Sequence, residues 1–148
     1  EIIAAPKVYA FDTGFVCYFR GWHALRRDDL GLLWEHYVLN ELHGRLQTRR
    51  IQYWRTKQGH EVDFVLARRG QPPIGIECKW SADEFDPAAL KAFARRYPTA
   101  EAVVVAHDVS RLFRRRFDSL DVSFESLEGL VQRLERQAGS VRQGVENA

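Results

Sequence analysis

Apolar residues change their spacing along the chain near residue 50. Between Leu30 and His43 they recur every three or four positions, as on one face of an amphipathic helix. Asp28 and Asp29 stand where an N-cap belongs, and Gly44 follows as a helix stop. From Ile51 onward the spacing falls to two, which is typical of strands. The pattern therefore predicts a helix over 30–43 and then a sheet.

The segment before this helix is shorter and less regular. Residues 7–11 alternate as in a short strand, and Asp12 or Thr13 is suited to cap a helix that ends at Tyr18 or Phe19. A linker over 21–27 then leads to the first long helix.

Three strands are expected after residue 50. They cover 51–56, 61–67 and 73–80, and glycine-containing turns at 57–60 and 68–72 separate them. Strands joined by turns this short form an antiparallel meander.

The second half returns to mixed patterns. Asp86 and Pro87 open a helix that runs to about Tyr97, and the apolar stretch 101–107 is typical of a strand buried on both faces. A basic segment covers 110–117, an amphipathic helix covers 125–137, and the polar tail 139–148 is expected to fray. We predict one α/β domain over 1–148, with a mixed central sheet and helices on both faces.

Strand alternation brings two acids together. Glu61, Asp63 and Val65 are expected on one face of their strand, and Glu77 and Lys79 share a face of the next. In a hairpin centred on Gly70, paired positions sum to 140, which places Asp63 opposite Glu77. Carboxylates placed opposite each other repel unless a cation joins them.

Oxygen ligands of this kind suit Mg²⁺ or Mn²⁺, which bind one or two carboxylates together with water and phosphate. Lys79 is placed to contact an attacking water or a phosphate oxygen. Together these groups are what phosphodiester hydrolysis requires. The alternative is a solvated cross-strand salt-bridge patch, which is the better interpretation of any isolated trio of this kind.

The long helix offers a fourth polar group. Glu35 falls on the stripe formed by Val38, Leu39 and Leu42, where a carboxylate is costly unless it has a partner. A shared metal ion would be such a partner. Glu41 is the fallback candidate from the same helix.

Composition narrows the class of protein. The chain has 148 residues, no methionine and only two cysteines, which excludes a disulfide framework and a four-cysteine zinc site. It has no apolar run long enough to span a membrane and no signal-peptide pattern, so we expect a cytoplasmic protein. The missing methionine suggests a piece of a longer protein. Residues 45–69 hold seven basic groups against two acids.

The order of these motifs resembles a known nuclease family. Asp63, then Glu77-Cys78-Lys79 after 13 intervening residues, resembles the PD-(D/E)xK motif of restriction-endonuclease-like nucleases, with Val62 in place of proline. The wider set resembles the C-terminal nuclease-like domain of bacterial and archaeal AAA-type ATP-binding proteins. It comprises 6–9, 11–14, 31–35, 53–57, 61–65 and 76–81.

The resemblance implies a restriction-endonuclease-like fold and a site in which Asp63, Glu77 and the Cys78 carbonyl bind the metal. It also implies nucleic-acid contacts from Arg55 and Lys57, and from Trp54, although packing is the preferred role for that ring. DNA is favoured over RNA as the partner. ATP would bind only in an upstream ATPase module, since this chain has no P-loop motif. A homo-oligomer is compatible with the resemblance.

Two functions follow as hypotheses. The first is metal-dependent phosphodiester hydrolysis by a nuclease domain linked to an ATPase. The second is a catalytically silent nuclease-like module that binds nucleic acid or a protein and regulates the ATPase. A plain interaction domain with a salt-bridged hairpin is the third alternative.

Overall fold

The computed structural model describes residues 7–47, 50–68 and 70–146. Pro6, Arg49, Arg69 and residues 147–148, on which parts of the sequence predictions fall, lie outside the described residues. The helices are α1 (Thr13–Phe19), α2 (Arg27–Leu46), α3 (Ala88–Arg96) and α4 (Leu127–Glu146), with a 3-10 turn at Ala82–Glu84. The strands are β1 (Ile51–Arg55), β2 (Glu61–Leu66), β3 (Ile74–Lys79), β4 (Glu101–Ala106), β5 (Phe113–Phe117) and β6 (Leu120–Glu125).

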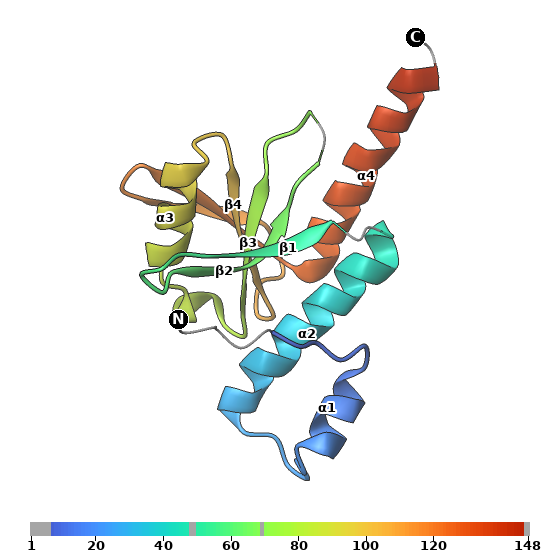
Figure 1. Ribbon diagram of the computed structural model, residues 1–148, viewed down its shortest axis with the longest axis vertical. Coiled ribbons are helices and arrows are strands. Elements are labelled where there is room, and N and C mark those ends of the chain that lie inside the picture. The colour runs from blue at the N-terminus through green and yellow to red at the C-terminus, as the bar shows by residue number, and fades with distance from the viewer. Residues whose placement is uncertain (1–6, 48–49, 69, 147–148) are drawn as a thin grey trace.

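The strands form one mixed sheet in the order β1-β2-β3-β4-β6-β5 (Figure 1). β1, β2 and β3 form the predicted antiparallel meander, and β3, β4 and β6 run parallel. β5 pairs antiparallel with β6 at the far edge. The mixed sheet and the meander are confirmed, but two further strands were not predicted: β5 lies in the basic segment after β4, and β6 follows it.

Helices cover both faces of the sheet, as predicted (Figure 1). On one face, Val38 and Leu42 of α2 and Leu130 and Leu134 of α4 pack into the same core. On the other face, Leu90 and Phe93 of α3 pack into a second core. No helix in the described part of the chain is long and apolar enough to cross a membrane.

The predicted N-terminal strand is wrong, because residues 7–11 form no ladder. Asn40 of α2 instead donates hydrogen bonds to the carbonyls of Phe11 and Ala10, at 2.9 and 3.3 Å. A helix side chain thus satisfies backbone groups that a neighbouring strand would otherwise bind. The following helix, α1, is confirmed, with Asp12 accepting the N–H of Gly14 at 2.6 Å.

The bounds of two helices also differ from the prediction. α2 starts at Arg27 and passes through Gly44 to Leu46, where Gln47 adopts the left-handed conformation that ends it. Arg45 binds Glu128 and Glu135 of α4, so tertiary contacts extend the helix beyond the glycine. α4 continues to Glu146 instead of ending near residue 137.

Candidate metal and nucleic-acid site

The β2–β3 hairpin has the register that a centre at Gly70 predicts. Leu66 pairs with Ile74, Val65 with Gly75, and Phe64 with Ile76. The main-chain pairing ends there.

Beyond Phe64, a side-chain hydrogen bond replaces the main-chain pairing between β2 and β3. The backbone N–H of Cys78 donates to Oδ2 of Asp63 at 2.8 Å. Asp63 therefore lies at the end of the ladder, beside the backbone that flanks Glu77.

A bulge in β2 changes the direction of Asp63. Gln52 and Trp54 of β1 are two residues apart, but their partners in β2, Val65 and Val62, are three apart. An extra residue of this kind breaks strict alternation and re-aims a side chain. Val65 packs in the core beneath α3, whereas Asp63 contacts a lysine that also binds α2. The expectation that Asp63 and Val65 share a face is therefore wrong.

One lysine joins three of the acids. Lys7 Nζ lies 3.0 Å from Oε1 of Glu35 and 3.6 Å from Oδ1 of Asp63, and it also forms an ion pair with Glu61. Tyr9 donates its hydroxyl proton to the same Oε1 of Glu35. The residues Lys7, Glu35, Glu61 and Asp63, together with Glu77 and Lys79, are called the acidic cluster below.

Glu77 and Lys79 form the other half of the cluster. Ile74, Ile76 and Cys78 share the core beneath α2 and α4, so alternation turns the Glu77 and Lys79 side chains away from that core, as predicted. The charge of Asp63 still acts on Glu77, where the β2–β3 ladder has ended. Lys79 Nζ lies 3.2 Å from Oε2 of Glu77. The Glu77 side chain is only 6% exposed, and its Oε1 is buried with no hydrogen-bond partner among the described residues.

Both central carboxyls have raised pKa values. Burial, then the charge of Glu35, raises the pKa of Asp63 to about 6, against the opposing effect of the Cys78 N–H. Burial, then the charge of Asp63, raises the pKa of Glu77 to about 7, although Lys79 lowers it. The charge of Glu35 thus disfavours ionisation of Asp63, the charge of Asp63 disfavours ionisation of Glu77, and each carboxyl is costly to ionise without a further cation.

Burial alone would lower the pKa values of the two lysines, but their carboxylate partners outweigh it. Contacts with Glu61 and Glu35 raise the pKa of Lys7 above its ordinary value. The charge of Glu77 is the main cause that raises the pKa of Lys79. Both lysines therefore stay charged at neutral pH.

The chemistry of these donors fits a hard divalent cation. Asp63 and Glu77 supply two carboxylates, and Oε1 of Glu77 lacks the partner that a buried oxygen normally has. Mg²⁺ is commonly bound through one or two carboxylates with water in the remaining positions. Across the described ranges, no group of three or more His, Cys, Asp or Glu side chains is arranged to hold a metal. Glu35 instead meets Asp63 through Lys7.

Four of the six cluster residues were predicted as site residues from the sequence, whereas Lys7 and Glu61 were given no role in a site. Glu35, and not the fallback Glu41, lies with Asp63. Lys7 and Tyr9 were predicted as parts of a short strand and of the family resemblance, although their alternation places both side chains on one side of the chain. The role of the Cys78 carbonyl stays a prediction.

A groove runs along β1, at the edge of the sheet, and reaches the acidic cluster. It has a volume of about 1050 Å³, and its lining includes Arg55, Lys57, Lys7 and Glu61. The ring of Trp54 also lines it but packs against Phe93 of α3, with ring centroids 5.4 Å apart. Packing is thus a role of Trp54, while Arg55 and Lys57 border the groove.

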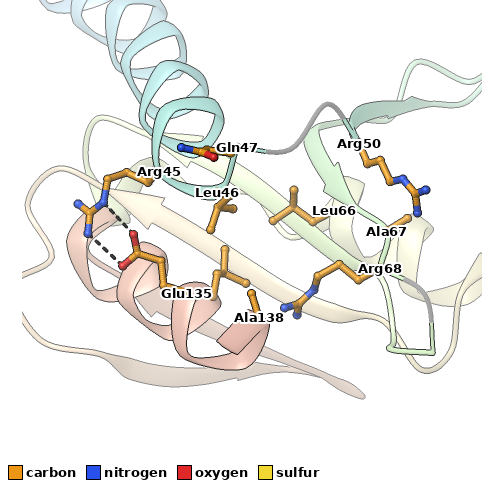
Figure 2. Close-up of a pocket in the computed structure, with 10 residues that line it drawn as sticks. Arg45, Leu46, Gln47, Arg50, Leu66, Ala67, Arg68, Glu135 and Ala138 are labelled. Atoms are coloured by element: carbon orange, nitrogen blue, oxygen red, sulfur yellow. Dashed lines mark hydrogen bonds and ion pairs between the residues drawn. The ribbon is translucent and has the colours of Figure 1, made fainter. Parts of the chain in front are cut away.

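A second cavity lies away from the cluster, where the end of α2 meets α4 and the end of β2 (Figure 2). It has a volume of about 400 Å³. Arg45 and Glu135 form an ion pair across its mouth, and Arg68 donates to Gln137 at 2.8 Å. These contacts tie α4 to the rest of the domain and include none of the acidic-cluster residues.

Residues 30–122 show which family the chain belongs to. This segment matches the family described as a domain of unknown function, DUF4143, and it includes most of α2, the meander, β4 and the start of β6. The chain belongs to the DUF4143 family. The match covers Glu35, Asp63, Glu77 and Lys79, while Lys7 lies before it.

Two mycobacterial relatives of this DUF4143 domain were found. They are uncharacterised proteins of Mycobacterium tuberculosis and Mycobacterium bovis, each 38% identical over 79 residues. The aligned part is 51% of this chain and 18% of each relative. The chain thus spans only a small part of the relatives that it matches.

Among solved structures, an assembly of Thermococcus gammatolerans McrB AAA+ hexamers with bound McrC is similar. Its TM-score is 0.46 and its identity 17%, over 65% of this chain and 27% of that chain.

Proposed function

We propose that this DUF4143 domain is a divalent-metal-dependent nuclease domain with a restriction-endonuclease-like fold, acting on DNA in preference to RNA. One observation carries the proposal. The carboxylate of Glu77 is buried, its pKa is raised by burial and then by the charge of Asp63 on the adjacent strand, and its Oε1 lacks a partner among the described residues. Such an arrangement is costly for the fold by itself and is suited to hold a cation.

Each residue of the cluster has a separate task in this proposal. Asp63 and Glu77 would hold Mg²⁺ or Mn²⁺, which supplies Lewis-acid activation of phosphate and water when bound. The Cys78 N–H fixes the orientation of the Asp63 carboxylate, leaving Oδ1 for the ligand. The Lys79 ammonium is placed beside Glu77 to stabilise negative charge that develops on a phosphate oxygen.

The groove along β1 supports a polyanionic substrate. Its Arg55 and Lys57 are exposed, and its far end meets the acidic cluster at Lys7 and Glu61. A strand of nucleic acid in this groove would place its phosphates against the two basic side chains.

A catalytically silent module is the second candidate, and one observation favours it. Lys7 already binds Asp63, Glu35 and Glu61, and an ammonium there neutralises the charge that a metal ion would neutralise. In that case the domain would bind nucleic acid or a protein without cleaving it.

We further propose that the domain acts with an AAA-type ATPase module in a longer cytoplasmic polypeptide, as the sequence resemblance implies, and that homo-oligomers form through that module. The greater length of the two mycobacterial relatives supports a longer polypeptide.

Cleavage assays separate the two candidate functions. Single- and double-stranded DNA and RNA are incubated with the protein in Mg²⁺ or Mn²⁺, and products are resolved on gels. If the domain is a nuclease, the wild type cleaves a substrate, and Asp63→Asn or Lys79→Ala lowers the cleavage rate about 100-fold or more. Exposed Asp121 on β6, next to the edge strand β5 and away from the acidic cluster, provides the control Asp121→Asn. Equal products from all four proteins would reject the nuclease, and binding without products would favour the silent module.

A further inference from the structure

Lys7 occupies the position in the acidic cluster at which a cation would bind Asp63 and Glu35. Its Nζ lies 3.0 Å from Glu35 and 3.6 Å from Asp63, and it pairs with Glu61 as well. The three carboxylates come from α2 and β2, which are far apart in sequence. One ammonium therefore joins acids that no direct hydrogen bond connects.

An ammonium and a divalent cation compete for these oxygens. Mg²⁺ binds carboxylate oxygens at about 2.0–2.1 Å, and Lys7 Nζ lies 3.6 Å from Oδ1 of Asp63. An ion on Oδ1 would therefore lie less than about 6 Å from Nζ, where the two positive charges repel each other. Lys79 does not create this conflict at Asp63, because its ion pair is with Oε2 of Glu77. The conflict is specific to Lys7.

The segment that carries Lys7 is anchored on its C-terminal side. Tyr9 packs against His36 and Phe64, with ring centroids 5.0 and 5.8 Å apart, and its hydroxyl binds Glu35. Asn40 holds the carbonyls of Ala10 and Phe11. Lys7 lies beyond these anchors on a backbone that belongs to no helix or strand, and its side chain is 33% exposed. It can leave the carboxylates by rotating its own side chain.

We propose that Lys7 is an internal competitor of the divalent cation: its ammonium occupies the acidic cluster when the metal is absent and leaves when the metal binds. This proposal rests on the proposed function, because it concerns the same two carboxylates, Asp63 and Glu77. It adds that the N-terminal segment, residues 7–11, sets the affinity of the site for metal. A position outside the segment matched to the family thus regulates the site.

The test is calorimetric titration of the 148-residue chain with Mn²⁺, without nucleic acid, so that binding and not activity is measured. Five proteins are compared: the wild type, Lys7→Gln, Lys7→Arg, Asp63→Asn and the control Lys91→Gln. Lys91 pairs with Asp118, away from the cluster. We expect Lys7→Gln to bind Mn²⁺ about tenfold more tightly than the wild type, and Lys7→Arg and Lys91→Gln to bind as the wild type does.

The outcomes distinguish this proposal from the proposed function. Binding that requires Asp63 but is equal or weaker in Lys7→Gln would overturn the competition and leave the metal site intact. Binding in no variant, or binding unaffected by Asp63→Asn, would overturn both. Thermal unfolding without metal checks that each variant folds, and a larger Mn²⁺-induced rise in Tm for Lys7→Gln than for Lys91→Gln gives an independent readout. An equal rise in both would contradict the competition.

Discussion

The backbone N–H of Cys78 donates a 2.8 Å hydrogen bond to Oδ2 of Asp63, at the point where main-chain pairing between β2 and β3 ends. This single contact orients a carboxylate beside the strand that carries Glu77. It also explains how Asp63 tolerates burial, because an N–H donor stabilises the ionised form. Glu77 has no equivalent donor at its Oε1 among the described residues.

Replacing Glu77 by glutamine should therefore stabilise the metal-free domain and abolish cleavage. The pKa of Glu77 is raised to about 7 even with Lys79 beside it, so the ionised carboxylate is costly to the fold near pH 8 and a neutral amide is not. We therefore expect the free energy of unfolding near pH 8 to rise by about 1–2 kcal/mol. Urea unfolding with a chelator measures this. Exposed Asp121 gives the control Asp121→Asn, which should leave stability nearly unchanged. A loss of stability in Glu77→Gln, with Asp121→Asn unaffected, would show that the carboxylate is satisfied in the metal-free fold.

The stability of the metal-free domain should fall as pH rises from about 4 to about 7. Asp63 and Glu77 have folded-state pKa values of about 6 and about 7, above their ordinary 3.8 and 4.5. The folded state thus holds protons that the unfolded state has lost, and raising the pH removes this advantage. We expect a difference on the order of 1–3 kcal/mol between the ends of this range.

The Asp63→Asn, Glu77→Gln double variant isolates this effect. Other groups that titrate between about pH 4 and 7 are common to both proteins, so they cancel in the difference. Saturating Mg²⁺ should remove most of the pH dependence of the wild type's free energy of unfolding, because the metal ion replaces the protons on the two carboxyls. Parallel stability curves for the two proteins without metal would contradict the raised pKa values.

Gly75 is required by packing, not by backbone conformation. A Cβ built on it would lie 2.8 Å from the ring of Phe93 and 3.2 Å from Leu90, both buried in α3. Gly75→Ala should therefore destabilise the domain by about 1–3 kcal/mol. Gly31 in α2 has nothing within 4 Å of its built Cβ, so Gly31→Ala is the matched control and should stabilise by up to about 1 kcal/mol. Thermal unfolding would contradict the packing argument if both changes had the same sign.

Lys57 should contribute to nucleic-acid affinity through phosphate contacts alone. It lies exposed on the turn after β1 and lines the groove that leads to the acidic cluster. Lys57→Gln should weaken binding similarly for all sequences and reduce the salt slope of log K by about one. Fluorescence anisotropy without Mg²⁺ measures this, with Lys91→Gln as the control. The same slope in Lys57→Gln and wild type would exclude the groove as the path of the strand.

Local patterns predicted the meander, its register and four members of the cluster, because turn residues and alternation act over short distances. Local patterns did not predict the features that depend on tertiary contacts. The bulge near Asp63 appears only in the pairing of β2 with β1, and the path of Lys7 depends on Asn40 of α2, 33 residues later. β5 was missed because an exposed run of arginines at a sheet edge has no apolar alternation. β6 was missed although Leu120, Val122 and Phe124 alternate with polar residues, which is a strand signal.

The most direct measurement is anomalous diffraction from crystals soaked in Mn²⁺, recorded at the manganese edge. We expect a peak bound by carboxylate oxygens of Asp63 and Glu77, with Lys7 Nζ displaced from Asp63. No peak at saturating Mn²⁺, with Lys7 still in contact with Asp63 and Glu35, would contradict the metal site on which the proposed function depends.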